Sequence, residues 1–215
     1  MHFLEKLFET FEAYYVGGYV RDLIRGYESL DIDIAVDASL KDFLPFVKKY
    51  NPYIMTKYEN CSFSYEGRKY SISRMRKDIM CDGRQAKIQP VHTIEEDALR
   101  RDFTINAIYM KFNGEFCDPV GGIQDLKDKK VQFIGEPEKR IKEDQLRMLR
   151  YFRFCALLEV MPADDIVRIC EKYYPIETVS KERIKEEYIR LLKLKPSHTF
   201  LDMIEKFYNV KQKDR

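Results

Sequence analysis

The chain has 215 residues, of which 45% are hydrophobic, 13% aromatic and 34% charged, so its length accommodates one sizeable domain or two small ones with an apolar core. No run of eighteen apolar residues occurs, and the charged opening segment does not resemble a signal peptide. This excludes a membrane-spanning helix and predicts a cytoplasmic protein without a membrane partner. The five cysteines are scattered without a Cys-x-x-Cys pair, so we expect reduced thiols and no zinc site.

The net charge of +2 is unevenly distributed. Residues 1–128 contain 18 basic and 21 acidic residues, whereas residues 129–215 contain 20 basic and 15 acidic ones. A basic second half is explained either by ordinary solvated helices or by contact with the phosphate backbone of a nucleic acid.

The first part of the chain alternates helical and extended patterns. Ser39 and Asp42 form a capping-box pattern that predicts a helix start. The predicted elements are, in order, a helix over 1–14, a strand at 14–16, a helix to about 25, a strand at 31–36, a helix from 39 to about 50, and strands at 53–56, 61–65 and 69–73. We therefore expect a sheet interleaved with helices.

The following part contains a break, a hairpin and then helices. No periodicity holds over 77–91, and Asp82-Gly83-Arg84 indicates a turn, so this stretch is expected to be a mobile loop. Thr93 and Glu96 predict a helix cap, and Asn113-Gly114 predicts a type I′ turn between strands at 108–112 and 115–117. A last strand is predicted at 131–134. Helices are predicted over 138–158, 163–172, 181–194 and 198–208, which places a domain boundary between 136 and 137.

Two short motifs near the amino terminus combine glycines, a basic residue and carboxylates. Gly17 and Gly18 precede a helix that carries Arg21, and backbone amides, a helix N-terminus and a guanidinium together favour a bound phosphate. Asp31 and Asp33 lie one residue apart in an apolar run, so they share one face of a strand. Two such carboxylates suit Mg²⁺. Alone, each motif also fits a turn or a solvated strand end, but together they predict a triphosphate cradle beside a metal site.

A second segment has a regular spacing of charges, because Asp144, Arg147, Arg150 and Arg153 recur every three residues. One interpretation is a helical Asp–Arg pair worth about 0.2–0.5 kcal/mol with solvated arginines. The other is base recognition, since an ionised Asp accepts from the amino group that cytosine and adenine share, and an Arg donates to the adjacent ring nitrogen. Uracil and guanine present a carbonyl oxygen where that amine is needed. Arg150 and Arg153 then suit a triphosphate or RNA backbone.

Four motifs follow one another in the chain. They are Gly-Gly-Tyr-Val-Arg-Asp at 17–22, Asp-Ile-Asp at 31–33, Arg-Arg-Asp-Phe-Thr-Ile-Asn-Ala at 100–107 and Glu-Asp-Gln-Leu-Arg at 143–147. In this order they resemble the class II tRNA nucleotidyltransferases and bacterial poly(A) polymerases. Further agreement at 82–84, 117–119, 121–126 and 147–154 extends the resemblance over about 14–160.

The resemblance implies an α+β fold, in which a polymerase-beta-like nucleotidyltransferase head with a mixed sheet and flanking helices, 1–136, precedes an all-α neck, 137–215. It implies an enzyme that adds CMP and AMP from CTP and ATP to the tRNA 3′ end by two-metal phosphoryl transfer. The implied roles are catalysis and Mg²⁺ binding for Asp31 and Asp33, triphosphate binding for Gly18, Arg21, Arg101, Arg150 and Arg153, base recognition for Asp144 and Arg147, and mainly scaffolding for Arg100, Asp102 and Asn106.

Three departures from the family pattern keep alternatives open. Ser71 occupies a place where relatives usually have Glu, and Glu59-Asn60-Cys61 replaces a common His-Gly-Thr. The chain stops at Arg215, so body and tail domains are expected to be absent or to form a separate chain. The 77–91 loop favours CCA addition, because a lever can switch one pocket from CTP to ATP. The alternatives are a CC-, A- or poly(A)-adding enzyme, and a truncated or split non-catalytic remnant that retains RNA-binding capacity.

Overall fold

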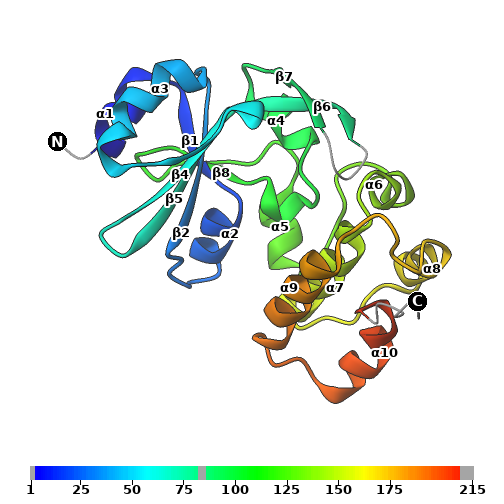
Figure 1. Ribbon diagram of the computed structural model, residues 1–215. Helices are drawn as coiled ribbons and strands as arrows, with labels where there is room; N and C mark the ends of the chain where they lie inside the picture. Colours follow the sequence, from blue (N-terminus) through cyan, green and yellow to red (C-terminus); the bar gives the residue numbers. More distant parts are fainter. Residues whose placement is uncertain (1–2, 82–85, 209–215) are drawn as a thin grey trace. The chain divides into compact units, whose positions relative to one another are not determined.

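The computed structural model describes residues 3–81 and 86–208, and the chain divides into two compact units (Figure 1). The first unit comprises 1–79 and 88–124, and the second comprises 80–87 and 125–215. The division between residues 124 and 125 falls before the predicted boundary between 136 and 137. The predicted domain boundary stays a prediction.

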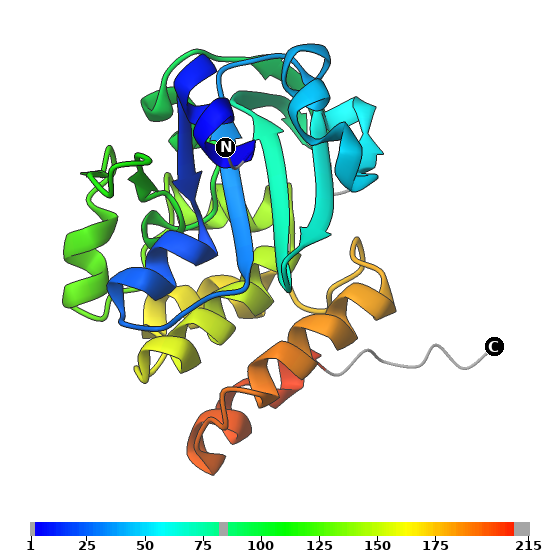
Figure 2. The same cartoon turned by 90° about the vertical axis from the view of Figure 1, so that its left-hand side faces the viewer.

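The first unit is a mixed sheet with flanking helices. Its strands include β1 (Ala13–Val16), β2 (Asp31–Val36), β3 (Tyr53–Met55), β4 (Asn60–Tyr65), β5 (Arg68–Arg74), β8 (Tyr109–Met110) and β9 (Phe116–Cys117). Its helices include α1 (Phe3–Thr10), α2 (Gly18–Ile24), α3 (Leu40–Val47), α4 (Ile94–Leu99) and the start of α5 (Gly122–Lys127). The seven strands follow the order β3-β4-β5-β2-β1-β8-β9, with β2 and β5 parallel. The central strands β1, β2, β5 and β4 lie side by side in Figure 2. This confirms the predicted α+β class.

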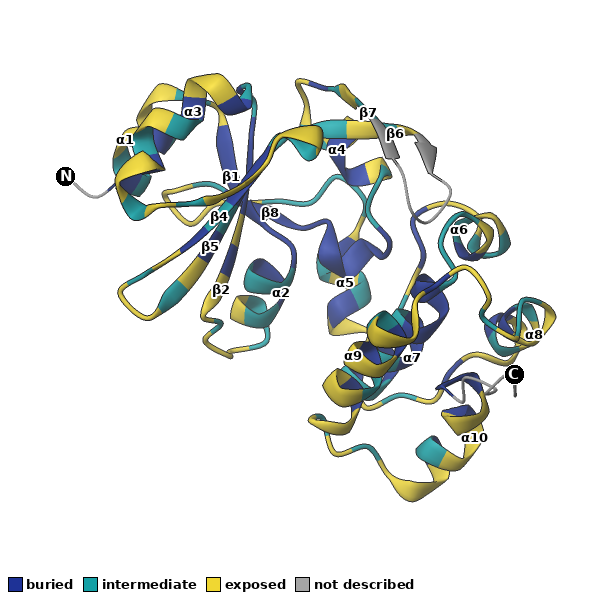
Figure 3. Cartoon of the chain, viewed as in Figure 1, coloured by how far each residue is buried: buried dark blue, intermediate teal, exposed yellow. Residues whose placement is uncertain are grey.

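Strand alternation separates an apolar face of the sheet from a polar one. Ile32 and Ile34 are buried, whereas Asp31 and Asp33, which alternate with them, are exposed. Figure 3 shows this alternation of buried and exposed residues along β2. Helices α1 and α3 lie together on the apolar side (Figure 1). There Phe3 of α1 meets the ring of Tyr70 edge-on with centroids 5.1 Å apart, a contact worth about 0.5–1.5 kcal/mol beyond its burial. The core on one face therefore leaves the carboxylates on the other.

Both predicted helix caps of the first unit are present. Ser39 and Asp42 form the capping box at the start of α3. The Thr93 hydroxyl accepts a hydrogen bond from the Glu96 backbone N–H at 3.3 Å. These contacts satisfy amides that have no partner within their helices.

Two predictions for residues 77–117 were wrong. The stretch 77–91 is not a loop, because β6 (Arg76–Cys81) and β7 (Ala86–Pro90) pair as a two-stranded sheet. Backbone pairing of this kind needs no hydrophobic period, so the sequence did not show it. The predicted turn at 82–84 lies outside the described residues. The Asn113-Gly114 turn is not type I′, which needs positive φ at both central residues, since Gly114 has φ 87° while Asn113 is not among the positive-φ residues. The Asn113 side chain instead accepts from the Glu115 N–H at 3.0 Å.

The second unit is mainly helical. Its helices include α6 (Pro137–Glu143), α7 (Leu146–Leu158), α8 (Asp164–Lys172), α9 (Lys181–Leu192) and α10 (His198–Tyr208). Two predictions needed correction here. The described part of 131–134 contains no strand element. The helix predicted over 138–158 is interrupted at Asp144, whose φ of −152° and ψ of 106° are extended, so Asp144 does not continue the helical ridge of the three arginines.

Helix α7 supplies the core of this unit. The Phe152 ring stacks on Phe207 of α10 with centroids 4.9 Å apart, and the Tyr208 hydroxyl donates to the Leu149 carbonyl at 2.9 Å. The thiols of Cys155 and Cys170 are buried and unbridged, and their burial raises the pKa of Cys155 to about 12. Over 3–81 and 86–208, no helix is both long and apolar enough to cross a membrane.

Candidate active site

Asp31 and Asp33 lie together on the exposed face of β2, as the sequence predicts. Within the described residues, neither carboxylate accepts a hydrogen bond or forms an ion pair within 4.0 Å. Two free carboxylates on one face offer the hard oxygen ligands that Mg²⁺ prefers. A group of three or more potential metal-ligating side chains does not occur in the described part of the chain.

Gly17 allows the backbone to pass close to these carboxylates. It has φ 76°, which favours glycine, and a Cβ atom there would lie 3.4 Å from Asp33 Oδ2 and 3.9 Å from Arg101 Nη1. Gly18 then begins α2, which places the first amides of that helix next to the acidic pair. The glycine pair, Asp33 and Arg101 therefore lie around one point of the first unit.

The pKa of Asp33 is raised above its ordinary value. Atoms around the carboxylate displace part of its water, and this desolvation is the largest cause; the charge of Asp31 acts in the same direction. The guanidinium of Arg101 partly offsets the shift. A divalent cation would favour the ionised pair in the same way as a second positive charge.

Asp97 of α4 fixes Arg101 in place. Its carboxylate is fully buried and receives Nη2 of Arg101 at 2.8 Å, Nε of Arg100 at 2.7 Å and the Tyr109 hydroxyl at 2.7 Å. Burial alone would raise the pKa of Asp97, but the two arginines outweigh it and hold that pKa well below the usual value. Asp97 lies outside the four motifs of the sequence, although its spacing of four residues before Arg101 is the spacing of a helical ion pair.

Arg21 is held by the motif at 100–107. It is almost buried, and its Nη1 donates to Asn106 Oδ1 at 2.6 Å. The Asn106 amide donates in turn to Asp102 Oδ1 at 3.0 Å, and that oxygen also accepts the Phe103 N–H. Asp102 and Asn106 thus make the local contacts expected of scaffolding residues, and Arg21 is oriented through them.

Gly122 packs against the same motif. Asp118 Oδ1 and Oδ2 accept from the amides of Gly122 and Ile123 at 2.8 Å each, which caps α5. A Cβ on Gly122 would lie only 2.2 Å from the Thr104 carbonyl oxygen. Close contact with the 3₁₀ turn Thr104–Asn106 therefore requires glycine here.

In the second unit, Asp144 and Arg147 lie at the break between α6 and α7. Asp144 Oδ1 accepts from the Leu146 N–H at 3.1 Å, and its other oxygen lies 3.6 Å from Arg183 of α9. Arg147 is nearly buried, and its Nη1 donates to Glu143 Oε2 at 2.7 Å and to the Arg140 carbonyl at 3.0 Å. Both side chains are therefore fixed by neighbours, which suits rigid base recognition; their roles stay predictions.

The two remaining predicted arginines differ in their surroundings. Arg153 Nε donates to Glu187 Oε2 at 2.7 Å, and Glu187 is 1% exposed. The guanidinium of Arg153 also lies over the Phe154 ring at 4.2 Å, whereas that of Arg150 lies 5.6 Å from it. Arg153 thus ties α7 to α9, while Arg150 is half-buried. The triphosphate contacts of both residues stay predictions.

Gln145 is a further residue that the sequence did not single out. Its Nε2 donates to the Tyr173 carbonyl at 2.9 Å, and its Oε1 accepts from the amides of Glu177 and Thr178 at 3.1 Å each. Gln145 therefore anchors the connection from α8 to α9. A glutamine in a charged motif gives no sequence signal for such a contact.

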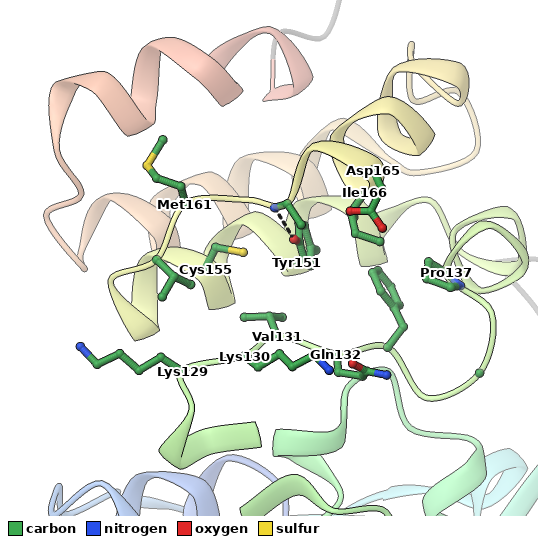
Figure 4. A pocket seen from close by; sticks show the side chains of 14 residues that line it. Lys129, Lys130, Val131, Gln132, Pro137, Tyr151, Cys155, Met161, Asp165 and Ile166 are labelled. Atoms are coloured by element: carbon green, nitrogen blue, oxygen red, sulfur yellow. Dashed lines mark hydrogen bonds between the residues drawn. The ribbon is translucent and has the colours of Figure 1, made fainter. Parts of the chain in front are cut away.

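The second unit also contains a cavity of about 370 Å³ (Figure 4). It lies between the segment 129–137, helix α7 and the residues around the start of α8, and the Tyr151 hydroxyl at its edge accepts the Ala163 N–H at 2.9 Å. Its lining includes none of the predicted site residues.

The fold and the acidic site define a nucleotidyltransferase head. The sequence family described as "Poly A polymerase head domain" matches residues 13–132. The CCA-adding enzyme of Bacillus pumilus is 36% identical over 186 residues, which cover 85% of this chain and 46% of that protein. Human mitochondrial CCA tRNA nucleotidyltransferase 1 is 34% identical over 86% of this chain and 44% of its own length. The chain therefore belongs to the family of the tRNA nucleotidyltransferases and poly(A) polymerases, and it spans about half the length of these curated relatives.

Solved structures agree with this assignment. The Bacillus stearothermophilus CCA-adding enzyme in complex with CTP has a TM-score of 0.80 and 31% identity, over 97% of this chain and 51% of that one. A tRNA nucleotidyltransferase complexed with a primer tRNA and an incoming ATP analog has a TM-score of 0.71 at 22% identity, covering 96% of this chain and 62% of that one, and supports the fold alone. The polymerase-beta-like head predicted from the motifs is thus confirmed.

Proposed function

We propose that this chain is the catalytic part of an RNA nucleotidyltransferase that adds CMP and AMP to the 3′ end of tRNA. The observation that carries the proposal is the pair Asp31 and Asp33 near Arg101, where a Cβ on Gly17 would lie 3.4 Å from Asp33 Oδ2 and 3.9 Å from Arg101 Nη1. Similarity to CCA-adding enzymes supports the choice of substrates, which are CTP, ATP and tRNA.

The residues of the first unit divide the work of phosphoryl transfer. We assign the triphosphate oxygens to the backbone at Gly18, to Arg101 and to Arg21, whose guanidinium is oriented by Asn106. Arg101 would stabilise the negative charge that develops on the leaving pyrophosphate. Its network with Asp97 means that little reorganisation is needed when the nucleotide binds.

Asp31 and Asp33 fit Mg²⁺, because their carboxylate oxygens accept no hydrogen bond within the described residues. Desolvation and the charge of Asp31 raise the pKa of Asp33, and a bound cation would offset both effects. When bound, two such ions would lower the pKa of the RNA 3′-hydroxyl and neutralise the leaving group. The two carboxylates would supply the anionic ligands for the ions at one side of the triphosphate cradle.

Base choice is assigned to Asp144 and Arg147. The Asp144 carboxylate can accept from the amino group of C or A, and Arg147, oriented by Glu143, can donate to the ring nitrogen. UTP and GTP would place a carbonyl oxygen against the carboxylate, and such a buried mismatch is costly.

Incorporation assays with single nucleotides test the proposal. Purified protein is incubated with tRNA transcripts that end before the first C, the second C or the final A of the CCA terminus, and with each labelled nucleoside triphosphate. We expect C, C and A to be added in order and UTP to be rejected. Addition of only CMP, only AMP or an AMP tail would reassign the enzyme within the family. No addition to any transcript, alone or with a separately encoded body and tail, would indicate a non-catalytic remnant and contradict the proposal.

A further inference from the structure

The polar face of the sheet continues beyond the acidic pair onto three more strands. In the parallel pairing of β2 and β5, Asp31 is opposite Lys69 and Asp33 is opposite Ser71. In the next pairing, Lys69 is opposite Ser64 and Ser71 is opposite Ser62. Residues that are opposite each other share a face, so Lys69 and these serines lie on the face that carries the carboxylates.

The row that starts at Asp33 ends on an aromatic side chain. Ser62 of β4 is opposite Tyr53 of the edge strand β3. Tyr53 is 70% exposed, although a large aromatic ring at a sheet edge is ordinarily covered when it serves a core. Because neighbouring strands lie about 4.8 Å apart, Tyr53 is roughly 14 Å across the sheet from Asp33.

The side chains along this row are available for a ligand. Lys69 is exposed and forms no ion pair within the described residues, even though it lies one strand from Asp31. Ser71 accepts a hydrogen bond from Asn60 Nδ2 at 3.1 Å, which leaves its own proton free to donate. An ammonium group and a hydroxyl donor are suited to a phosphodiester, and an exposed ring is suited to a stacked base.

The residues on the two sides of the acidic pair differ, and this difference indicates which side binds the nucleoside triphosphate and which side binds the RNA. On the β1 side lie Gly17 and Arg101, which suit a triphosphate, while the β5 side carries Lys69, Ser71 and, further out, Tyr53. An in-line displacement needs its attacking and leaving oxygens on opposite sides of the phosphorus. The β5 side is therefore where the attacking 3′-hydroxyl and its RNA strand must arrive.

We propose that Lys69, Ser71, Ser62 and Tyr53 form a track for the acceptor end of the RNA, with the terminal phosphodiester on Lys69 and Ser71 and an unpaired base stacked on Tyr53. The track rests on the proposed function, because it assigns the second substrate of that reaction. It predicts recognition of a single-stranded 3′ end by charge and stacking, without base-edge contacts.

The first test removes one charge from each partner. Binding of a labelled single-stranded RNA is measured by anisotropy at low salt for the wild type and Lys69→Gln, with either a normal or an uncharged methylphosphonate terminal linkage. Lys69→Gln should weaken binding of normal RNA roughly fivefold and should not weaken the modified RNA further. Lys69→Arg should restore binding, and Lys41→Gln, on α3 at the apolar side, is the matched control. Equal losses on both RNAs, or no loss, would overturn the track.

The second test follows stacking directly. A 2-aminopurine near the 3′ end should lose fluorescence when bound to the wild type and to Tyr53→Phe but not to Tyr53→Ala; Tyr27→Ala, which removes another exposed tyrosine, is the control. Retained quenching in Tyr53→Ala would overturn the stacking assignment. Both tests are binding measurements, so a protein that shows this pattern but incorporates no nucleotide would contradict the proposed function and support the track.

Discussion

Arg101 Nη2 lies 2.8 Å from Oδ2 of Asp97, and the same oxygen accepts the Tyr109 hydroxyl at 2.7 Å. A fully buried carboxylate thus fixes the guanidinium that lies beside Gly17 and influences Asp33. The guanidinium that we assign to the triphosphate is therefore positioned by a carboxylate that is itself fully buried.

We expect Asp97→Asn to lose about 3–5 kcal/mol of unfolding free energy at pH 7, because it leaves a network of buried donors without its charge. The pKa of Asp97 is lowered in the folded state, so this stabilisation is present above the unfolded pKa and is lost as pH falls. Below about pH 4 the difference between wild type and variant should shrink by about 1.4 kcal/mol per pH unit. Urea unfolding at pH 7, 4 and 3 measures it. A difference that does not change with pH, or an equal effect of the exposed-site control Asp202→Asn, would contradict this account.

Gly122→Ala should destabilise the first unit strongly. The added Cβ would lie 2.2 Å from a backbone oxygen of Thr104 that cannot rotate away, and such overpacking costs about 1–3 kcal/mol or more. Gly26→Ala is the comparison, since Gly26 has φ 81° but open space around it, and it should cost only the strain of about 1–2 kcal/mol. Thermal unfolding that ranks Gly26→Ala as the more harmful change would show that the Gly122 contact relaxes easily.

Much of this site could be predicted from the sequence because its signals are local. Alternation around Asp31 and Asp33 predicted a shared strand face, and the Ser39 and Thr93 caps predicted two helix starts. The remainder depends on long-range contacts. Asp97 and Gln145 acquire their roles only through partners that folding brings to them, and the break at Asp144 is not visible in a continuous helical pattern. The pairing of β6 with β7 is local, but it rests on backbone hydrogen bonds, which need no hydrophobic period in the sequence.

Gln145→Met should loosen the connection between α8 and α9. It keeps the side-chain volume but removes the acceptor for the Glu177 and Thr178 amides and the donor to the Tyr173 carbonyl. Amide hydrogen exchange over 173–180 should become faster, while exchange in α4 stays unchanged. Gln145→Glu retains the acceptor and should restore part of the protection. Unchanged exchange in the methionine variant would remove the anchoring role.

Arg153→Ala should cost about 3 kcal/mol of stability, because it withdraws the nearer partner of the buried Glu187. Arg190 also donates to Glu187, but its side chain is 56% exposed, so Arg190→Ala should cost no more than about 1 kcal/mol. Denaturant unfolding compares the two. If Arg153→Ala is as stable as the wild type but has a raised KM for CTP, the residue serves the triphosphate and its structural contact is dispensable.

Single-turnover transfer of labelled CMP to a tRNA that lacks its last three nucleotides tests the central assignment most directly. Asp31→Ala and Asp33→Ala should each slow transfer by at least about 10²–10³-fold while the far-UV spectrum and unfolding midpoint stay close to those of the wild type, and Asp202→Ala should transfer at the wild-type rate. Wild-type turnover in either β2 variant would show that the acidic pair is not the catalytic centre.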